Sequence, residues 1–352
     1  MDWNPGTLLE MSGYYWKTCT LHAGVKLDIF TIIGSSTLSR GKIAEKLGMD
    51  ERGVTMLLNA LAAMELLVKK KDTYTNTTEA LTFLSKDSKQ YIGFMILHHH
   101  HLAQSWVNMD QAIRQGSPIR QTASHSEEEE KAPIHQPAPV AEPAPVSEEE
   151  RRESFLMGMF NIGMATAPGL AKDLDLSQCT RLLDLGGGPG TFAIHFCLNN
   201  PGLAAEICDL PTTRPFAEKT IEQFKVSDQV SFTPGDYTRK DFCLDQKFDA
   251  AWLSHILHGE GPEMAEKIIA RAISALRPGG KIFIHEFILD NTMDGPLFPA
   301  LFSLNMFLGT QKGQSYTEKQ LIDMLTAQGV VDIARLDFKG PTESGILAGK
   351  IK

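Results

Sequence analysis

The sequence of 352 residues predicts a helical N-terminal domain followed by an α/β domain with a mostly parallel sheet. Two patterns support this prediction. Between residues 23 and 77, apolar residues recur at helical spacing, and Gly48 and Asp50 mark a helix end and a helix start. From Thr180 onward, short apolar runs such as RLLDLG and FDAAWLSH alternate with helical segments, as they do in βαβ units.

Changes in composition divide the chain into four predicted parts. Residues 1–95 have the pattern of an all-helical, winged-helix-like domain, and residues 96–121 form a connecting helical region. Residues 122–153 contain five prolines, two runs of Glu and no aromatic side chain, so we expect a flexible insert that buries no core. Residues 154–352 form the α/β domain.

The charge balance argues against a nucleic-acid partner. The chain has 34 Lys plus Arg against 43 Asp plus Glu, a formal net charge of -9. The helix that would enter a DNA groove, DERGVTMLLNALAAMELL, offers one Arg on a mainly apolar surface, so we expect it to bury a protein partner instead. The sequence has no apolar run long enough for a membrane span and no basic, apolar leader, and we expect a cytoplasmic protein.

A glycine-rich loop follows the first predicted strand of the α/β domain. It reads GGGPG directly after Asp184 and Leu185, and a helix begins near Thr191. Glycines let the backbone turn tightly and approach a ligand at a helix N-terminus. The GxGxxG spacing of nicotinamide-binding loops is not met, because Thr191 and Ala193 stand where its last glycine is required. The carboxylate of Asp184 favours a ligand with an ammonium group, such as S-adenosylmethionine, over a pyrophosphate.

Acidic residues also end the next two predicted strands. Asp209 closes the run EICD, and its carboxylate can accept hydrogen bonds from both hydroxyls of a ribose. Asp236 and Tyr237 follow the third strand, where a carboxylate can accept from an adenine amino group and a ring can cover the base. Each pattern is weak alone, since acidic residues commonly follow strands as turn residues. Acidic residues at three successive strand ends together predict a nucleoside-bearing ligand.

These residues resemble the small-molecule O-methyltransferases of the plant caffeate and animal hydroxyindole type. The resemblance covers nearly the whole chain and includes LLDLGGGPG, ICDLP, PGDY, FDAAWLSHILHGEGPE, LRPGGKIFIHEFIL and GQSYTEKQL. It implies a Rossmann-like class I methyltransferase sheet and an N-terminal winged-helix domain through which two chains dimerise. The residues expected to hold S-adenosylmethionine are Asp184, Gly186, Gly188, Asp209, Leu210, Asp236, Tyr237 and Ser254.

The catalytic motif of that family, a His after the fourth strand followed by an acidic stretch, falls on His258. Glu286, at the end of the fifth strand, takes the position of the Glu that orients this base. His255 lies one helical turn before His258 and is interpreted as structural. The chain departs from the family pattern at two positions: Ser315 replaces a second flanking Glu, and Gly259 replaces an Asp that often follows the base.

The resemblance also implies an acceptor pocket between two flexible apolar stripes. The residues assigned to this pocket are Met157, Phe160, Met164, Phe302, Asn305 and Met306. By default such stripes belong to a core, but the corresponding helices of the family clamp a flat acceptor. Asn305 is the polar member of its stripe and can fix the orientation of the acceptor.

The sequence predicts no metal site. The five Cys residues are scattered and contain no CxxC pair. In the run from His98 to His101, only the first and the last His can share a ligand on one helix face, and no third ligand is indicated. The alternative for these histidines is that one or more of them face the acceptor pocket.

The predicted activity is methyl transfer from S-adenosylmethionine to a small, hydroxylated and partly apolar acceptor, with His258 as general base. The protein is expected to act as a homodimer. An acceptor that arrives as an anion or a thiolate needs little help from a base, so S-, N- or C-methyl transfer by proximity stays open. A winged-helix regulator that only senses S-adenosylmethionine also stays open, although its domain would need a basic face and shows only the cluster Lys69 to Lys71.

Overall fold

The computed structural model describes residues 2–119, 147–242, 244, 245 and 247–352. The chain divides into two compact units, of which the first comprises Met1–Ala103 with Ser147–Asn161, and the second Gln104–Val146 with Ile162–Lys352. Most of the predicted flexible insert lies outside the described residues. The last residues of this insert were predicted to be flexible but are helical, since helix α9 (Glu148–Asp173) begins among them.

A capping box explains why α9 begins so early. The Ser147 hydroxyl accepts from the backbone N–H of Glu150 at 3.1 Å, and the Glu150 carboxylate accepts from the backbone N–H of Ser147 at 2.9 Å. Three Glu residues occupy the first turn of the helix, where the helix dipole favours negative charge. The acidic run that suggested a solvated insert is therefore in part a helix start.

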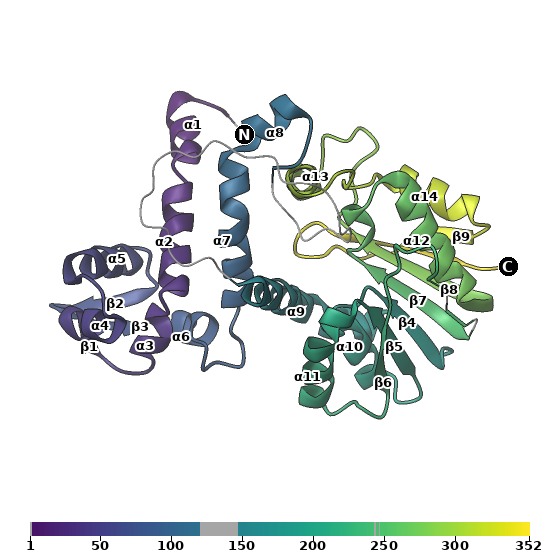
Figure 1. Ribbon diagram of the computed structural model, residues 1–352, viewed down its shortest axis with the longest axis horizontal. Coiled ribbons are helices and arrows are strands. Elements are labelled where there is room, and N and C mark those ends of the chain that lie inside the picture. The colour runs from purple at the N-terminus through teal and green to yellow at the C-terminus, as the bar shows by residue number, and fades with distance from the viewer. Residues whose placement is uncertain (1, 120–146, 243, 246) are drawn as a thin grey trace. The chain divides into compact units, whose positions relative to one another are not determined.

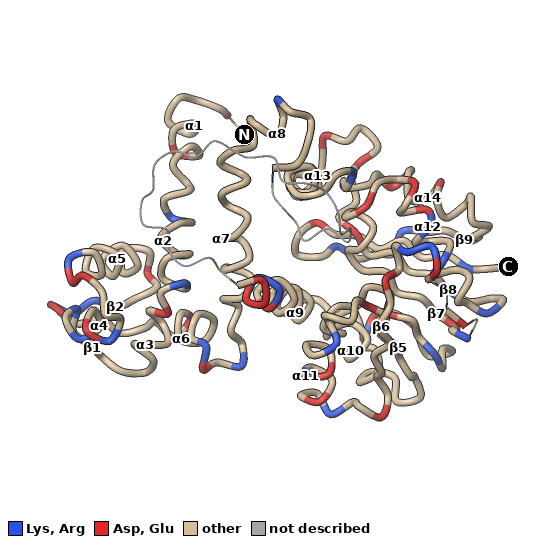
Figure 2. The backbone as a smooth tube through the Cα atoms, in the orientation of Figure 1, with Lys and Arg blue, Asp and Glu red and all other residues tan. Residues whose placement is uncertain are grey.

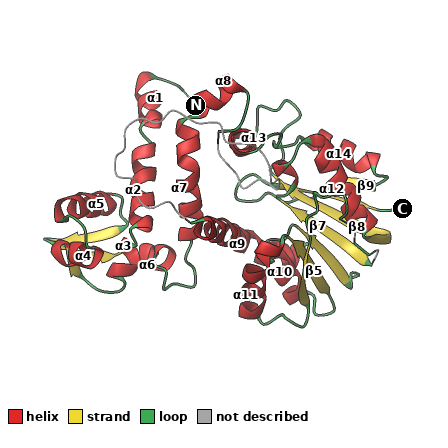
Figure 3. Ribbon diagram, in the orientation of Figure 1, coloured by secondary structure: helices red, strands yellow, loops and turns green. Residues whose placement is uncertain are grey.

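The first unit is mainly helical, as predicted, but it also contains a small antiparallel sheet of order β1-β3-β2 (Figures 1 and 3). A turn at Lys71, whose φ is +54°, joins β2 to β3, and Tyr74 of β3 is fully buried. Besides parts of α7 (Gly93–Val107) and α9, its elements are α1 (Pro5–Ser12), α2 (Tyr15–Lys26), α3 (Ile29–Ile33), β1 (Leu38–Ser39), α4 (Arg40–Leu47), α5 (Glu51–Ala63), β2 (Leu67–Lys70), β3 (Thr73–Asn76) and α6 (Thr78–Leu84).

The predicted helix signals between α4 and α5 are confirmed. Gly48 ends α4 in the left-handed conformation, with φ +63°, which a glycine adopts without steric cost. The Asp50 side chain accepts from the backbone N–H of Gly53 at 2.8 Å and so caps α5. The apolar face of α5, including Leu58 and Leu61, is buried in the core of this unit.

The second unit contains a seven-stranded sheet of order β6-β5-β4-β7-β8-β10-β9 (Figure 3). The first five strands in this order are parallel, whereas β10 runs antiparallel to both β8 and β9. The strands are β4 (Arg181–Leu185), β5 (Ala204–Asp209), β6 (Val230–Pro234), β7 (Phe248–Ser254), β8 (Leu276–Glu286), β9 (Val331–Arg335) and β10 (Gly345–Lys350). The helices that lie wholly in this unit are α8 (Met109–Gln115), α10 (Thr191–Asn199), α11 (Arg214–Phe224), α12 (Pro262–Ser274), α13 (Leu297–Gly309) and α14 (Glu318–Ala327).

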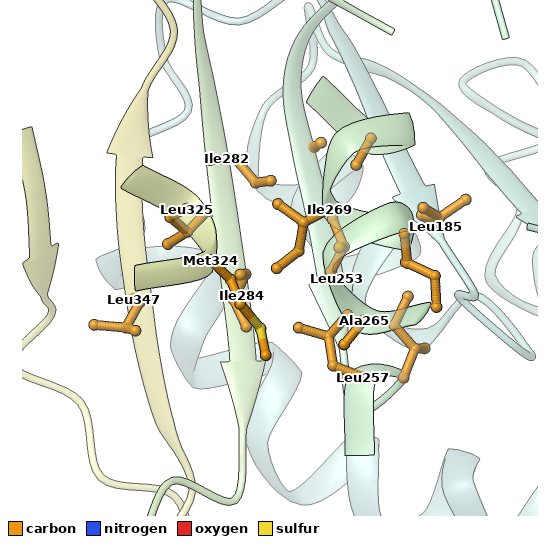
Figure 4. Packing of buried hydrophobic residues seen from close by; sticks show 14 of the residues in the cluster. Leu185, Leu253, Leu257, Ala265, Ile269, Ile282, Ile284, Met324, Leu325 and Leu347 are labelled. Carbon is orange, nitrogen blue, oxygen red and sulfur yellow. The ribbon is translucent and has the colours of Figure 1, made fainter. Parts of the chain in front are cut away.

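Both faces of the central strands are buried. Successive side chains of a strand point to opposite faces, so Trp252 packs with α10 on one face and Leu253 packs with α12 on the other. Figure 4 shows the second of these layers, in which Leu253 lies close to Ala265 and Ile269 of α12. Strands buried on both faces read as continuous apolar runs, which is the pattern that predicted them.

Charged residues occur throughout both units, but α7 contains none (Figure 2). Its sequence GFMILHHHHLAQSWV contains no acidic residue, Lys or Arg. No helix in the described part of the chain combines the length and the apolar character needed to cross a membrane.

The core of the sheet generates a stability prediction. Leu253 of β7 has no exposed surface, and Leu253→Ala should lower the free energy of unfolding of this unit by about 2 to 5 kcal/mol, because it removes buried methyl groups and leaves a cavity. Urea unfolding followed by circular dichroism measures the loss. Leu198→Ala on α10, where the side chain is 48% exposed, is the control and should cost less than about 0.5 kcal/mol. An equal cost at both positions would contradict this packing.

Candidate active site

The predicted site residues of the second unit gather at the carboxyl edge of the parallel strands. Parallel register aligns Leu185 of β4 with Cys208 of β5 and Leu253 of β7, and aligns Ser254 of β7 with His285 of β8. The residues that follow these positions therefore lie along one edge of the sheet. Ligands of open α/β sheets bind at this edge.

The glycine-rich loop after β4 has the conformation that the sequence predicted. Gly186, Gly188 and Gly190 all have positive φ, at +69°, +55° and +80°. A Cβ atom on Gly186 would lie 2.5 Å from Cγ2 of Ile256, whereas a Cβ on Gly188 would meet no atom within 4 Å. The loop thus packs closely on one side and leaves open space above Gly188.

Asp209 connects this loop to the next strand. Its Oδ2 accepts from the backbone N–H of Gly188 at 2.8 Å, and its Oδ1 accepts from the backbone N–H of Leu210 at 2.6 Å and from Thr213 Oγ1 at 3.1 Å. These bonds hold the carboxylate in one orientation beside the open space. A ribose with two vicinal hydroxyls fits this arrangement, because each carboxylate oxygen has more than one acceptor position.

Asp184 lies beneath the loop and is 1% exposed. Neither of its oxygens has a hydrogen-bond partner of ordinary geometry among the described residues, although the backbone of Ala193 partly favours the charged form. Burial raises the pKa of this carboxyl to about 7, and the nearby Asp209 adds to the rise. A positively charged group beside Asp184 would satisfy it, as the ammonium of S-adenosylmethionine can.

Asp236 and Tyr237 follow β6 at the same edge. Asp236 Oδ1 accepts from the backbone N–H and the hydroxyl of Thr238, at 2.9 and 2.6 Å. A cavity of about 250 Å³ opens here. Its lining residues are Cys208, Thr233, Pro234, Gly235, Asp236, Arg239, Asp241, Phe242 and Leu244. The ring of Tyr237 lies on the other side of the turn, beside Gly186.

Ser254, at the end of β7, is part of a buried polar chain. Its hydroxyl lies 2.9 Å from Nδ1 of His285, and Nε2 of the same ring lies 3.0 Å from the hydroxyl of Ser344. Burial keeps the pKa of His285 well below its ordinary value. This chain joins β7, β8 and the start of β10, and a contact of Ser254 with the cofactor stays a prediction.

His258 and Glu286 form a hydrogen-bonded pair. Nδ1 of His258 lies 2.8 Å from Oε2 of Glu286, and Oε1 accepts from the backbone N–H groups of Leu257 and His258 at 2.9 and 3.3 Å. Glu286 is 2% exposed, and burial alone would raise its pKa. The hydrogen-bonded His258 and the nearby His255 lower this pKa below its ordinary value instead, so the carboxylate is charged.

His255 also approaches Glu286, which the sequence interpretation did not anticipate. Its Nδ1 lies 3.6 Å from Oε2 of Glu286, and burial lowers the pKa of His255. Its φ of +57° is uncommon for a residue with a side chain. The HILH spacing placed two histidines near each other, but only the backbone conformation at His255 directs the first of them to the carboxylate.

Aromatic rings surround His258. The ring centroid of Phe302 lies 4.7 Å away in an edge-on arrangement, and Phe287 is stacked at 5.9 Å. Phe287 and Phe298, which were not assigned to the site, pack against Phe302 with centroids at 4.5 and 6.0 Å. The imidazole therefore faces an apolar, flat-walled environment.

The other residues assigned to the acceptor pocket lie on α9 and α13. Asn305 Oδ1 accepts from Nε1 of Trp106 at 3.3 Å, and Met306 is 8% exposed on the same helix. Met164 contacts Nε2 of His195 on α10 through its sulfur, at 3.3 Å. Met157 and Phe160 belong to the first unit, and their role in the pocket stays a prediction.

Ser315 does not take over the function of the carboxylate that it replaces. Its hydroxyl donates to the backbone oxygen of Pro299 at 2.9 Å, and its backbone N–H donates to Ser303 Oγ at 3.2 Å. Ser315 therefore ties the segment before α14 to α13. The neighbouring Gln314 holds the turn that carries His258, because its backbone N–H donates to the backbone oxygen of His258 at 2.9 Å.

Two histidines of the run on α7 contact side chains of the first unit. The ring of His98 lies 5.3 Å from that of Phe155, and the ring of His100 lies 5.6 Å from that of His22. Nε2 of His100 is also 3.0 Å from Nζ of Lys26. Burial lowers the pKa of His22 to about 4, and His100 and His99 add to this effect.

Comparison with known sequences decides the family. Residues 142–331 match the O-methyltransferase domain, and residues 9–86 match the O-methyltransferase dimerisation domain. The chain belongs to the O-methyltransferase family. It is an S-adenosylmethionine-dependent methyltransferase with a class I methyltransferase fold, as the sequence predicted. The dimerisation domain supports assembly as a homodimer.

Relatives of this methyltransferase extend over nearly its full length. The 3-hydroxy-5-methyl-1-naphthoate 3-O-methyltransferase of Streptomyces sahachiroi is 29% identical over 346 residues, which cover 98% of this chain and 95% of the relative. Acetylserotonin O-methyltransferase of Bos taurus is 26% identical over 351 residues and 97% of both chains. The structure of human N-acetylserotonin methyltransferase in complex with S-adenosylmethionine has 21% identity and a TM-score of 0.81, and covers 100% of this chain and 98% of the other.

Asp209 generates a prediction about cofactor binding. Asp209→Ala removes the carboxylate that holds Gly188 and that fits the ribose hydroxyls, so it should weaken S-adenosylmethionine binding roughly ten- to hundredfold. Titration calorimetry measures this loss. Asp228→Ala is the matched control, because Asp228 is exposed at the opposite end of the strands. Equal affinities in both variants would contradict the assignment.

Asp184 generates a prediction about pH. A carboxyl with a pKa of about 7 is largely protonated at lower pH, and an ammonium bound beside it favours the charged form. Binding should therefore release a proton, and affinity for S-adenosylmethionine should rise between about pH 5.5 and 7, where the α-amino group of the ligand stays protonated. Calorimetry in buffers of different ionisation enthalpy detects the released proton. The slope should disappear in Asp184→Asn, and an unchanged slope in that variant would assign the effect to another group.

Proposed function

We propose that this methyltransferase transfers the methyl group to a hydroxyl of a flat aromatic acceptor, with His258 as general base. The observation that supports this most directly is the pair formed by His258 Nδ1 and Glu286 Oε2 at 2.8 Å. A carboxylate on one ring nitrogen holds the neutral imidazole in the tautomer whose other nitrogen, Nε2, can accept a proton. General-base catalysis needs such an oriented group within reach of the acceptor hydroxyl.

Glu286 is suited to orient the base without taking part in the proton transfer. Its Oε1 is held by two backbone N–H groups, and its charged form is favoured in the folded protein. When His258 takes a proton from the acceptor, the buried negative charge stabilises the resulting imidazolium. The pair therefore does not depend on Ser315, which faces α13.

The cofactor residues proposed along the strand edge act mainly by positioning. S-adenosylmethionine supplies a methyl group on an already activated sulfonium. Asp209 and the open space above Gly188 suit the ribose, and the buried carboxylate of Asp184 suits the amino group. Holding donor and acceptor in line accounts for a large part of the rate in a displacement of this kind.

The aromatic rings around His258 support a flat, apolar acceptor. Phe287, Phe298 and Phe302 form a continuous set of ring contacts next to the imidazole. Two of the relatives act, by their names, on a hydroxynaphthoate and on acetylserotonin, which are both hydroxylated aromatic molecules. We propose an acceptor of the same class for this enzyme.

We further propose that the dimer forms through the first two helices of the first unit. Leu9, Tyr15 and Trp16 on α1 and α2 are 74%, 61% and 69% exposed, and these helices fall largely within the matched dimerisation domain. Large apolar side chains exposed together are typical of an interface. A second copy of this chain is the partner that the family match supports.

The role of His258 can be tested by single-turnover methyl transfer with a hydroxynaphthoate and with N-acetylserotonin as probes. His258→Ala should lower the rate by about 10² to 10⁴ while S-adenosylmethionine still binds, because the variant lacks the base but keeps the strand-end residues. Glu286→Gln should lose less, since the imidazole remains. Asp228→Ala serves as the control with an unchanged rate. A fully active His258→Ala enzyme would exclude a general base and favour transfer by proximity alone.

A further inference from the structure

Two imidazole nitrogens converge on one carboxylate oxygen at the ends of β7 and β8. Nδ1 of His258 lies 2.8 Å from Glu286 Oε2, and Nδ1 of His255 lies 3.6 Å from the same atom. His255, His258 and Glu286 each offer one potential ligand atom, and these three atoms all lie within 4.8 Å of one another. The Nδ1 atom of His255 is buried and lacks a hydrogen bond of ordinary geometry among the described residues.

The backbone holds His255 in this position. Its φ of +57° lies in the left-handed region, which is costly for a residue other than glycine unless its surroundings fix it. The backbone N–H of His255 donates to the backbone oxygen of His285 at 2.8 Å. The ring lies between those of His285 and Phe287, with centroids at 4.3 and 4.2 Å. The second imidazole is therefore directed at the carboxylate by the fold.

This donor set is one that zinc prefers. Two imidazoles and one Glu carboxylate are the protein ligands of several catalytic zinc sites, where the fourth position is left to water or substrate. With Zn–N and Zn–O bonds of about 2.0 to 2.2 Å, ligand atoms of a tetrahedral site lie roughly 3.3 to 3.5 Å apart. The two observed separations, 2.8 and 3.6 Å, lie on either side of this range.

The surroundings of Glu286 also suit a metal ligand. Its second oxygen, Oε1, accepts from the backbone N–H groups of Leu257 and His258, and such bonds orient a ligating carboxylate. The parallel pairing of β7 with β8 places His255, directly after β7, beside Glu286 at the end of β8, and His258 follows in the turn after β7.

We propose that His255 Nδ1, His258 Nδ1 and the Glu286 carboxylate form a binding site for a zinc-type divalent ion, and that occupancy of this site blocks methyl transfer. Zinc at Nδ1 of His258 replaces the proton that this nitrogen shares with Glu286. A neutral imidazole that ligates through Nδ1 carries its proton on Nε2, so that proton moves across the ring. Nε2 then has no lone pair with which to take a proton from the acceptor.

The proposal that zinc binds at this site is argued from the geometry alone. The proposal that zinc inhibits methyl transfer rests on the proposed function of His258 as general base. The two parts are therefore tested by different measurements. Magnesium and calcium prefer oxygen ligands and should not compete for this site.

Binding is measured on the full chain after removal of metals with a chelator. Calorimetric titration with zinc chloride should show one tight site for each chain, and cobalt chloride should give the visible absorption of tetrahedral Co²⁺. His255→Ala and Glu286→Gln should each weaken zinc binding at least about tenfold. Retained binding of S-adenosylmethionine confirms that each variant is folded.

Matched controls separate this site from other histidines. His195→Ala removes one His from α10 in the same unit, and a double variant His98→Ala with His101→Ala removes two from the run on α7. Both should bind zinc as the wild type does. Loss of binding in the double variant, or unchanged binding in His255→Ala and Glu286→Gln, would overturn the assignment.

Inhibition is measured as single-turnover methyl transfer at increasing zinc concentration. The rate should fall in parallel with occupancy of the calorimetric site and recover after addition of a chelator, and magnesium should have no effect. Zinc that binds without slowing the reaction would overturn the inhibitory role and with it the general base. Absence of zinc binding in an enzyme that still requires His258 would overturn the metal site and leave the proposed function intact.

Discussion

The buried carboxylate of Glu286 is the group that holds together the carboxyl ends of β7 and β8. It ends β8, and it accepts from the backbone of the turn after β7 as well as from the imidazole of His258. A charged group with almost no exposed surface is tolerated only when its hydrogen bonds are satisfied. The turn that carries His258 is thus fixed by the same bonds that make burial of Glu286 possible.

The parallel sheet brings the remaining groups to this carboxylate. Five strands run in the same direction, and their apolar residues are buried on both faces by helices. The polar side chains that connect the strands at this edge lie at the strand ends, where the chain leaves the core. Asp209, Ser254 and Glu286 are the last residues of β5, β7 and β8, and each uses its side chain to connect its strand to a neighbouring segment.

The site combines fixed charges with apolar walls. Asp184 and Glu286 are both buried acids, but their surroundings act in opposite directions on their pKa values. Asp184 has no hydrogen bond of ordinary geometry among the described residues and holds its proton more firmly, whereas two imidazoles and two backbone amides favour the charged form of Glu286. One carboxyl is suited to receive a cation, and the other to orient a base. The rings of Phe287 and Phe302 lie beside the imidazole of His258 and pack against each other.

The sequence by itself determined the alternation of strands and helices in the second unit, the glycine loop, the acidic strand ends and the family, because these depend on local spacing and on residue type. It also paired His258 with Glu286 through the family resemblance, and the structure brings these two side chains within hydrogen-bond distance. Only the tertiary structure decided which side chains from different strands and turns contact one another. The left-handed backbone of His255, the orientation of Ser315 toward α13 and the packing of Phe287 beside the imidazole come from contacts between segments far apart in the chain. Such contacts leave no periodic pattern in the sequence, so the family motif favoured His258 and gave no indication that the ring of His255 also approaches Glu286.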